Sequence, residues 1–216
     1  MTDETPDRTL DAGFFRRWLG VVAAGAVEDA ADRLTELDSA IGDADHGSNL
    51  QRGFRAVTAA LEKDPPASPG AVLILAGGQL ISTVGGASGP LYGTLLRRTG
   101  KALGDAAEVT PEQFAEALRA GVTAVTQLGG AAPGDKTMID ALEPAVEALA
   151  APAPAGPSFR AAAEAAERGA LATVPLRARK GRASYLGERS IGHQDPGATS
   201  SALLIAALAD TAEAAR

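Results

Sequence analysis

Residues 68–83 read Ser-Pro-Gly-Ala-Val-Leu-Ile-Leu-Ala-Gly-Gly-Gln-Leu-Ile-Ser-Thr, and they decide between a helical and a mixed fold. Their apolar centre, residues 72–75, is the stretch of the chain that could most readily form a β-strand in place of a helix. A short apolar run suits either a buried strand or a buried helix. The pair Ser68-Pro69 favours the helix, since serine caps free backbone N–H groups and proline needs no donor in the first turn. We therefore predict a helix over residues 70–83.

Apolar positions recur at helical spacing along the rest of the chain. The stripe of Leu10, Phe14, Trp18 and Val21 continues toward Leu37 and predicts one long first helix. Further helices are expected at residues 48–63, 90–103, 111–128, 138–150, 157–173 and 197–215, with starts marked by Thr110-Pro111, Asp195-Pro196 and a capping box from Thr110 to Gln113. With about eight helices, the predicted fold class is all-α, in a single domain covering residues 1–216.

Composition excludes several classes of function. The net charge of −7 argues against generic binding to nucleic acid or to an anionic membrane. The absence of cysteine excludes disulfides, thiolate catalysis and zinc–thiolate sites. Residues 1–11 are polar and carry acids, and no stretch reaches ~18 uninterrupted apolar residues, so neither a secretory signal nor a membrane span is expected. We predict a cytoplasmic protein.

The connections between the predicted helices are of two kinds that alternate along the chain. Those at residues 64–67, 104–109 and 151–158 carry no convergent polar groups. Those at residues 38–47, 85–93, 129–137 and 177–197 are rich in glycine and in functional side chains. In an up-and-down bundle or barrel every second connection lies at the same end. The four decorated connections should therefore share one rim and form one site.

The first decorated connection carries Asp38, Asp43 and Asp45, which converge if the chain turns at Gly42 and then runs extended. Three close carboxylates need a compensating cation, and an oxygen-only set suits Mg²⁺ or Ca²⁺. An EF-hand fits poorly, because Phe54 stands where its bidentate Glu belongs, so magnesium is the predicted metal. The alternative is a solvated loop of capping and turn acids.

The other three connections carry groups that could bind a ligand, each with a simpler alternative. The helix start near Ser88 offers free amides to a phosphate, unless the glycines only form a packing turn. Met138 suits an adenine face or the core. The connection after residue 177 suits a lid or clamp in which Arg182 or Arg189 contacts phosphates, while the basic run at residues 177–180 also fits a solvated face. His46 and His193 could belong to the site, or they could be structural histidines with satisfied hydrogen bonds.

These blocks resemble the L subunit of dihydroxyacetone kinase. Gly-Asp-Ala-Asp-His-Gly-Ser-Asn, Gly-Gly-Ala-Ser-Gly-Pro-Leu-Tyr-Gly, Gly-Asp-Lys-Thr-Met and the long block from Gly181 occur in the family's order between Asp38 and Ser201. The resemblance implies an eight-helix antiparallel barrel with ADP or ATP at one rim and two Mg²⁺ ions on Asp38, Asp43 and Asp45. By the same match the nucleotide pocket would contain His46, Gly47, Ser48, Asn49, Ala87, Ser88, Gly129, Met138, Arg182, Asp195, Pro196 and Gly197. Leu50 departs from the methionine that is usual in the family.

The resemblance also implies partners. A separate K subunit would present dihydroxyacetone on a histidine, so neither histidine of this chain has that role, and Asp38, Asp43, Asp45 and Arg182 would serve phosphoryl transfer. An M subunit of the phosphotransferase system would rephosphorylate a bound ADP. This type of kinase is favoured over one that exchanges ATP. The alternatives are a kinase subunit for another short ketose or a fatty acid, or a nucleotide-dependent regulatory docking module. The oligomeric state stays open, a homodimer included.

Overall fold

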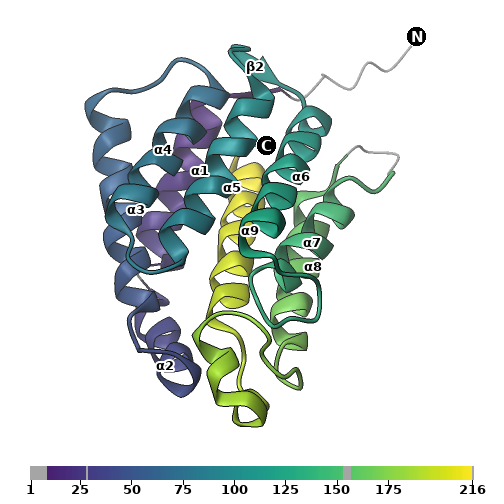
Figure 1. Cartoon of the computed structure of the whole chain (residues 1–216). Coiled ribbons are helices and arrows are strands. Elements are labelled where there is room, and N and C mark those ends of the chain that lie inside the picture. Colours follow the sequence, from purple (N-terminus) through teal and green to yellow (C-terminus); the bar gives the residue numbers. More distant parts are fainter. Residues whose placement is uncertain (1–8, 28, 153–156, 216) are drawn as a thin grey trace.

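The computed structural model describes residues 9–27, 29–152 and 157–215, and in them the chain is almost wholly helical (Figure 1). The elements in chain order are β1 (Leu10–Asp11), α1 (Ala12–Val21), the π-helix η1 (Val22–Val27), α2 (Ala31–Ile41), α3 (His46–Lys63), α4 (Pro69–Thr83), α5 (Ser88–Leu103), β2 (Glu108–Val109), α6 (Pro111–Gly129), α7 (Ile139–Leu149), α8 (Phe159–Ala172), the 3₁₀ segment η2 (Arg182–Ser190) and α9 (Pro196–Ala214). The all-α prediction is confirmed.

Residues 72–75 are helical and lie inside α4. The helix begins as predicted, with the Ser68 hydroxyl accepting a hydrogen bond from the Ala71 amide. It packs closely on α5, because a Cβ atom added at Gly77 would lie only 2.6 Å from the Gly93 carbonyl oxygen. The glycines that weaken the local helix preference thus allow the two helices to approach each other, and packing of the apolar run stabilises α4.

The single long first helix was a wrong prediction. The helix is interrupted: α1 continues into the π-helix η1, which ends at Val27, and α2 starts at Ala31. A π-helix has a different hydrogen-bonding register from an α-helix, and apolar periodicity does not predict this change. Within the described residues nine α-helices therefore replace the expected eight. The start of α1 is held by Asp11, which caps the Phe14 amide, and by antiparallel pairing of Leu10 with Val109, a short ladder that the apolar pattern did not predict.

Successive helices pack side by side, including α4 with α5, α5 with α6, and α7 with α8. In Figure 1 the α2–α3, α4–α5, α6–α7 and α8–α9 connections lie toward the lower end, and the α3–α4 and α5–α6 connections lie at the other. Aromatic side chains form a cluster within the core, in which the ring centroids of Phe15 and Phe114 lie 5.2 Å apart. The Trp18 indole joins it and donates a 3.0 Å hydrogen bond to the Leu204 carbonyl in α9.

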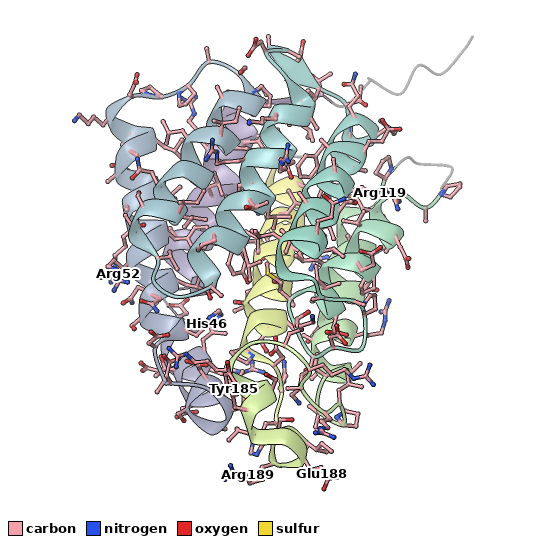
Figure 2. The ribbon with its side chains drawn as sticks, viewed as in Figure 1. His46, Arg52, Arg119, Tyr185, Glu188 and Arg189 are labelled. Atoms are coloured by element: carbon pink, nitrogen blue, oxygen red, sulfur yellow. The ribbon has the colours of Figure 1, made fainter. Side chains whose placement is uncertain are left out.

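The α8–α9 connection, for which a lid or clamp is predicted, contains η2. Figure 2 shows Glu188 and Arg189 of this segment at the extreme lower end of the molecule, and Tyr185 above them, between them and His46. Among the helices of the described ranges, none combines the length and apolar character that a membrane crossing requires.

Candidate functional site

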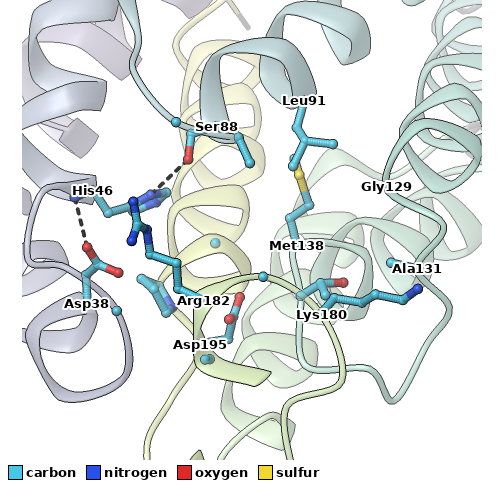
Figure 3. A pocket seen from close by; sticks show the side chains of 18 of the residues that line it. Asp38, His46, Ser88, Leu91, Gly129, Ala131, Met138, Lys180, Arg182 and Asp195 are labelled. Atoms are coloured by element: carbon cyan, nitrogen blue, oxygen red, sulfur yellow. Dashed lines mark hydrogen bonds between the residues drawn. The ribbon is translucent and has the colours of Figure 1, made fainter. Parts of the chain in front are cut away.

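All four decorated connections line one cavity of about 480 Å³, which Figure 3 shows from close by. The first turns of α3, α5, α7 and α9 reach it through His46, Ser88, Ile139 and Pro196. Asp43 and Ser88, 45 residues apart in sequence, thus belong to the same pocket. The unpaired N–H groups of a helix start are hydrogen-bond donors with a favourable dipole, so the cavity suits an anion.

The acidic loop is shaped by the end of α2. The helix stops at Ile41, Gly42 follows with φ −140° and ψ −135°, and Ala44 has a positive φ of 63°. One carboxylate oxygen of Asp38 accepts hydrogen bonds from the amides of Asp45 (2.9 Å) and His46 (3.2 Å). A side chain at position 42 would overlap the other Asp38 oxygen. The predicted turn at Gly42 therefore brings the three carboxylates together.

One carboxylate oxygen each from Asp38, Asp43 and Asp45 lies within 4.8 Å of the others. This donor set consists only of oxygen, and Asp38 is buried while the other two are exposed, so the cluster fits a hard divalent cation with open positions toward the pocket. Across the cluster the Arg182 guanidinium pairs with Asp43 at 2.9 Å. Arg182 thereby links η2 to the acidic loop and supplies positive charge to it.

His46 anchors a buried hydrogen-bonded chain. Its Nε2 lies 2.8 Å from the Ser200 hydroxyl and its Nδ1 lies 3.2 Å from the Ser88 hydroxyl. Ser200 is 2.6 Å from the Tyr92 hydroxyl, which is also 2.9 Å from Ser201. Burial lowers the pKa of His46 against the opposing effect of Asp38, and burial raises the pKa of Tyr92 to about 12. Both side chains are thus neutral, and they hold the first turns of α3, α5 and α9 in place.

Asp195 shapes the start of α9. Its carboxylate accepts a 2.7 Å hydrogen bond from the Ala198 amide, and its own amide donates to the Thr173 hydroxyl at 2.9 Å. The side chain is buried and lines the cavity. Burial raises its pKa to about 7, although the Ala198 amide acts in the opposite direction. The predicted helix start at Asp195-Pro196 is confirmed, and its acid is a cap that faces the pocket.

Lys136 is a buried link instead of a free cation. Its side chain is 1% exposed and its backbone has a positive φ of 64°. The ammonium group donates to the carbonyl oxygens of Thr173 (2.8 Å), Leu176 (3.2 Å) and His193. Desolvation lowers its pKa, opposed chiefly by Asp195. The side chain therefore fastens the connection that carries Arg182 to the one that carries Met138.

The cavity has a polar side and an apolar side. Figure 3 shows Asp38 and His46 on one side, Leu91 and Met138 on the other, and Arg182 between the labelled groups. Met138 is 5% exposed and belongs to the core as well as to the lining, so both of its predicted roles are compatible with its position.

Most residues that the resemblance assigns to the nucleotide pocket line the cavity; they are His46, Ala87, Ser88, Gly129, Met138, Arg182, Asp195, Pro196 and Gly197. The predicted nucleotide contacts of Gly47, Ser48 and Asn49 stay predictions, because these residues lie beside the cavity in the first turn of α3. Gly47 packs α3 against the Ala31 carbonyl, and Asn49 accepts a 2.6 Å hydrogen bond from Arg52.

Several lining residues were not predicted. They are apolar side chains on helix faces: Ile41, Val125, Leu128 and Ile139. Their signal in the sequence is ordinary helical periodicity, which does not separate a core position from a pocket wall. Of the two arginines suggested as phosphate contacts, Arg182 lines the cavity and Arg189 lies outside it.

Known proteins are similar in sequence to this chain over most of its length. The DAK2 domain family matches residues 40–210. The ADP-binding subunit of the PEP-dependent dihydroxyacetone kinase of Escherichia coli is 46% identical over 83% of this chain and 87% of that subunit. The ADP-binding subunit of kinase 1 of Listeria innocua is 42% identical over 94% of this chain and 98% of its own. This chain belongs to the dihydroxyacetone kinase L-subunit family. The relatives' names confirm the predicted enzyme class, a kinase subunit of the PEP-dependent type.

Longer kinases contain a similar unit. The dihydroxyacetone kinase from C. freundii, solved in complex with AMP-PNP and Mg²⁺, superposes with a TM-score of 0.73 at 28% identity over 97% of this chain and 36% of its own. The L-erythrulose 1-kinase of Mycolicibacterium smegmatis is 39% identical over 84% of this chain and 33% of its own. The L-subunit chain thus spans about a third of these enzymes.

Proposed function

We propose that this L-subunit chain holds a magnesium-bound adenine nucleotide in the rim cavity and takes part in phosphoryl transfer to dihydroxyacetone. The observation that carries the proposal is the polarity of the cavity, in which three convergent carboxylates and a helix start face an apolar wall. A nucleotide has the same polarity, with a charged polyphosphate at one end and a flat base at the other. Its metal-bound phosphates suit the acidic side, and its adenine suits Met138 and Leu91.

Each side of the cavity has a role in this proposal. Asp38, Asp43 and Asp45 would hold the metal, two ions by the family resemblance, and bound magnesium supplies charge neutralisation to phosphates. The backbone amides at the start of α5 donate to phosphate oxygens, where the helix dipole favours negative charge. Arg182 pairs with Asp43 in the present structure. When it binds a phosphate in place of Asp43, its planar guanidinium offers two parallel N–H donors. These groups also stabilise the charge that spreads in the transition state.

The acceptor is proposed to be dihydroxyacetone carried by a separate K subunit. Phosphoryl transfer needs positioning and charge stabilisation more than a nucleophile from this chain. His46 is unsuited to carry a triose, because the ring is buried and Ser88 and Ser200 engage its two nitrogens.

The donor is proposed to be an M subunit of the phosphotransferase system, which would rephosphorylate ADP that stays bound. The PEP-dependent names of the similar subunits support this type. A second candidate is an ATP-exchanging subunit for another short ketose, favoured by the match to an erythrulose kinase. A regulatory docking module, the third, would bind nucleotide without transferring phosphate.

We further propose one domain over residues 1–216, built on a continuous core. A cytoplasmic location and a homodimer stay predictions.

The test measures nucleotide in the purified protein. Native mass spectrometry after gel filtration should detect retained ADP, and titration calorimetry of stripped protein should give magnesium-dependent ADP binding. Asp43→Ala should weaken that binding at least about tenfold, since a hydrogen-bonded charge contributes roughly 1.5–3 kcal/mol. Asp64→Ala, an exposed acid at the opposite end of α3, is the control and should bind normally. Unchanged affinity in Asp43→Ala would refute the proposal, and an empty protein that binds ATP reversibly would favour the second candidate.

A further inference from the structure

Arg52 connects two helices beside the nucleotide cavity without lining it. The residue is exposed on α3 (Figure 2), and its Nε donates to the Thr83 carbonyl oxygen at 2.9 Å. Its Nη2 donates to the side-chain oxygen of Asn49 at 2.6 Å. Thr83 is the last residue of α4, where the final carbonyls of a helix have no partner inside it. One planar guanidinium therefore ties the end of α4 to the start of α3.

Asn49 is nearly buried, and its two polar atoms have different surroundings. The residue is 7% exposed, and its Oδ1 accepts from Arg52, whereas its Nδ2 has no hydrogen-bond partner among the residues that the structure describes. Within those residues no fully buried side-chain nitrogen or oxygen lacks a partner, so Nδ2 keeps access to solvent. A Cβ atom added at Gly85 would lie 3.5 Å from Nδ2, and Gly85 lines the cavity. The free NH2 group thus lies at the edge of the cavity.

Arg52 decides which way the Asn49 amide faces. An asparagine amide has an oxygen and a nitrogen of similar size, and its hydrogen-bond partners select one of two orientations. A guanidinium has donors only, so it binds the oxygen and never the NH2 group. Without Arg52 both orientations are open, and in one of them the amide oxygen faces the cavity and repels an anion.

The edge of the cavity at Gly85 is rich in hydrogen-bond donors. Gly85 lies just before α5, whose first backbone amides are free, and the Asn49 NH2 group adds a donor of fixed direction. Phosphate oxygens are acceptors that suit such a place. We propose that Arg52 is a positioning residue, which holds the Asn49 oxygen so that the NH2 group donates to a phosphate oxygen of the bound nucleotide; this role rests on the proposed function.

Calorimetry of magnesium-dependent ADP binding tests the role of Arg52. Arg52→Met removes the donors and keeps the aliphatic stem, and it should weaken binding about three- to tenfold, as for loss of one hydrogen bond. Arg119→Met, the same change on the exposed surface of α6, is the control and should bind like the wild type (Figure 2).

A double-mutant cycle separates positioning of Asn49 from simple capping of α4. In an Asn49→Ala background, Arg52→Met should cause no further loss of ADP affinity, because two changes that act through one group do not add. An equal loss in both backgrounds would overturn the proposal, since Arg52 would then act through Thr83 alone. Normal affinity in Arg52→Met would overturn it as well.

Asn49→Asp distinguishes a ligand contact from a structural role. The variant keeps an oxygen for Arg52 and replaces the NH2 group with a second oxygen, which repels phosphate. Its midpoint of urea unfolding should equal or exceed that of the wild type, while its ADP affinity falls at least about tenfold, as for loss of a hydrogen bond to a charged group. Retained ADP affinity in this variant would contradict the proposed contact.

The chain has a single asparagine, so labelling with ¹⁵N-asparagine gives one side-chain amide in an NMR spectrum. Magnesium and ADP should shift the NH2 signals of the wild type, and signals that stay unchanged when ADP binds would overturn the proposal. In the nucleotide-free protein, Arg52→Met should already move these signals, because the contact with Oδ1 is lost. A wild type that binds no ADP would refute the proposed function instead, whereas the nucleotide-free spectra would still show whether Arg52 orients Asn49.

Discussion

The Lys136 ammonium donates a 2.8 Å hydrogen bond to the backbone carbonyl of Thr173, from a side chain that is 1% exposed. Two further carbonyls, those of Leu176 and His193, accept from the same group. One side chain from the α6–α7 connection thus satisfies three acceptors at both ends of the segment that carries Arg182. The relative position of two walls of the cavity depends on this contact.

Lys136→Met should remove the donor while keeping most of the side-chain volume. Three carbonyls would lose a partner, and a buried unsatisfied polar group costs about 1–3 kcal/mol. We expect the free energy of unfolding to fall by roughly 3 kcal/mol in urea titrations. Lys101→Met, at an exposed position in the last turn of α5, should change it by less than about 0.5 kcal/mol. Equal stability of the two variants would contradict the linking role.

The Asp195 carboxyl predicts a pH dependence of stability. Its pKa in the folded protein is raised from 3.8 to about 7, so between these values the folded state binds more protons than the unfolded state. The contribution of Asp195 to stability is complete below pH 3.8 and is lost as the pH rises toward 7. Asp195→Asn keeps a capping acceptor but cannot ionise.

The comparison therefore uses urea unfolding of both proteins at several pH values from 4 to 8. The stability of the wild type relative to Asp195→Asn should decline with rising pH by at most about 1.4 kcal/mol per unit, and then level off above pH 7. Subtracting the variant removes the contribution of other groups, such as His46, whose lowered pKa acts with the opposite sign. A difference that is flat over this range would show that burial does not perturb Asp195.

Gly42→Ala should weaken metal binding without removing a ligand. The added methyl group would overlap Asp38 Oδ1 and displace the carboxylate that also receives the amides of Asp45 and His46. We expect magnesium-dependent ADP affinity to fall at least about tenfold in calorimetry, as for loss of one charged hydrogen bond. Gly20→Ala, where the added carbon meets open space, is the control. Normal affinity in Gly42→Ala would mean that Asp38 is not needed in its present position.

The adjacent glycines of α4 should respond in opposite directions. A Cβ atom at Gly77 would lie 2.6 Å from the Gly93 carbonyl oxygen, so Gly77→Ala must push α4 away from α5. Overpacking of this kind costs about 1–3 kcal/mol. Gly78 faces open space, and Gly78→Ala should stabilise the helix by about 0.5–1 kcal/mol. Thermal unfolding of the two variants tests this, and a shift of the same sign in both would refute close packing.

Most helix positions follow from the sequence because their causes are local. Ser68-Pro69, Thr110-Pro111 and Asp195-Pro196 each begin a helix where predicted, through short side chains that cap amides within three residues. The gathering of Asp43 and Ser88 at one end also followed, since alternate connections of antiparallel helices share an end. The first helix failed this reasoning, because an apolar stripe does not reveal a change of helical register at η1.

Tertiary structure alone decided which residues of the decorated connections are buried and which face the cavity. Lys136 and Arg182 are both cations in such connections, yet one is buried under three carbonyls and the other faces the acidic cluster. Leu91 and Leu128 have ordinary helical spacing, yet they form the apolar wall of the cavity. Sequence determined where helices start and which groups reach the rim, because capping and periodicity act over a few residues. Burial and orientation depend on segments far apart in the chain, so only the packed fold decides them.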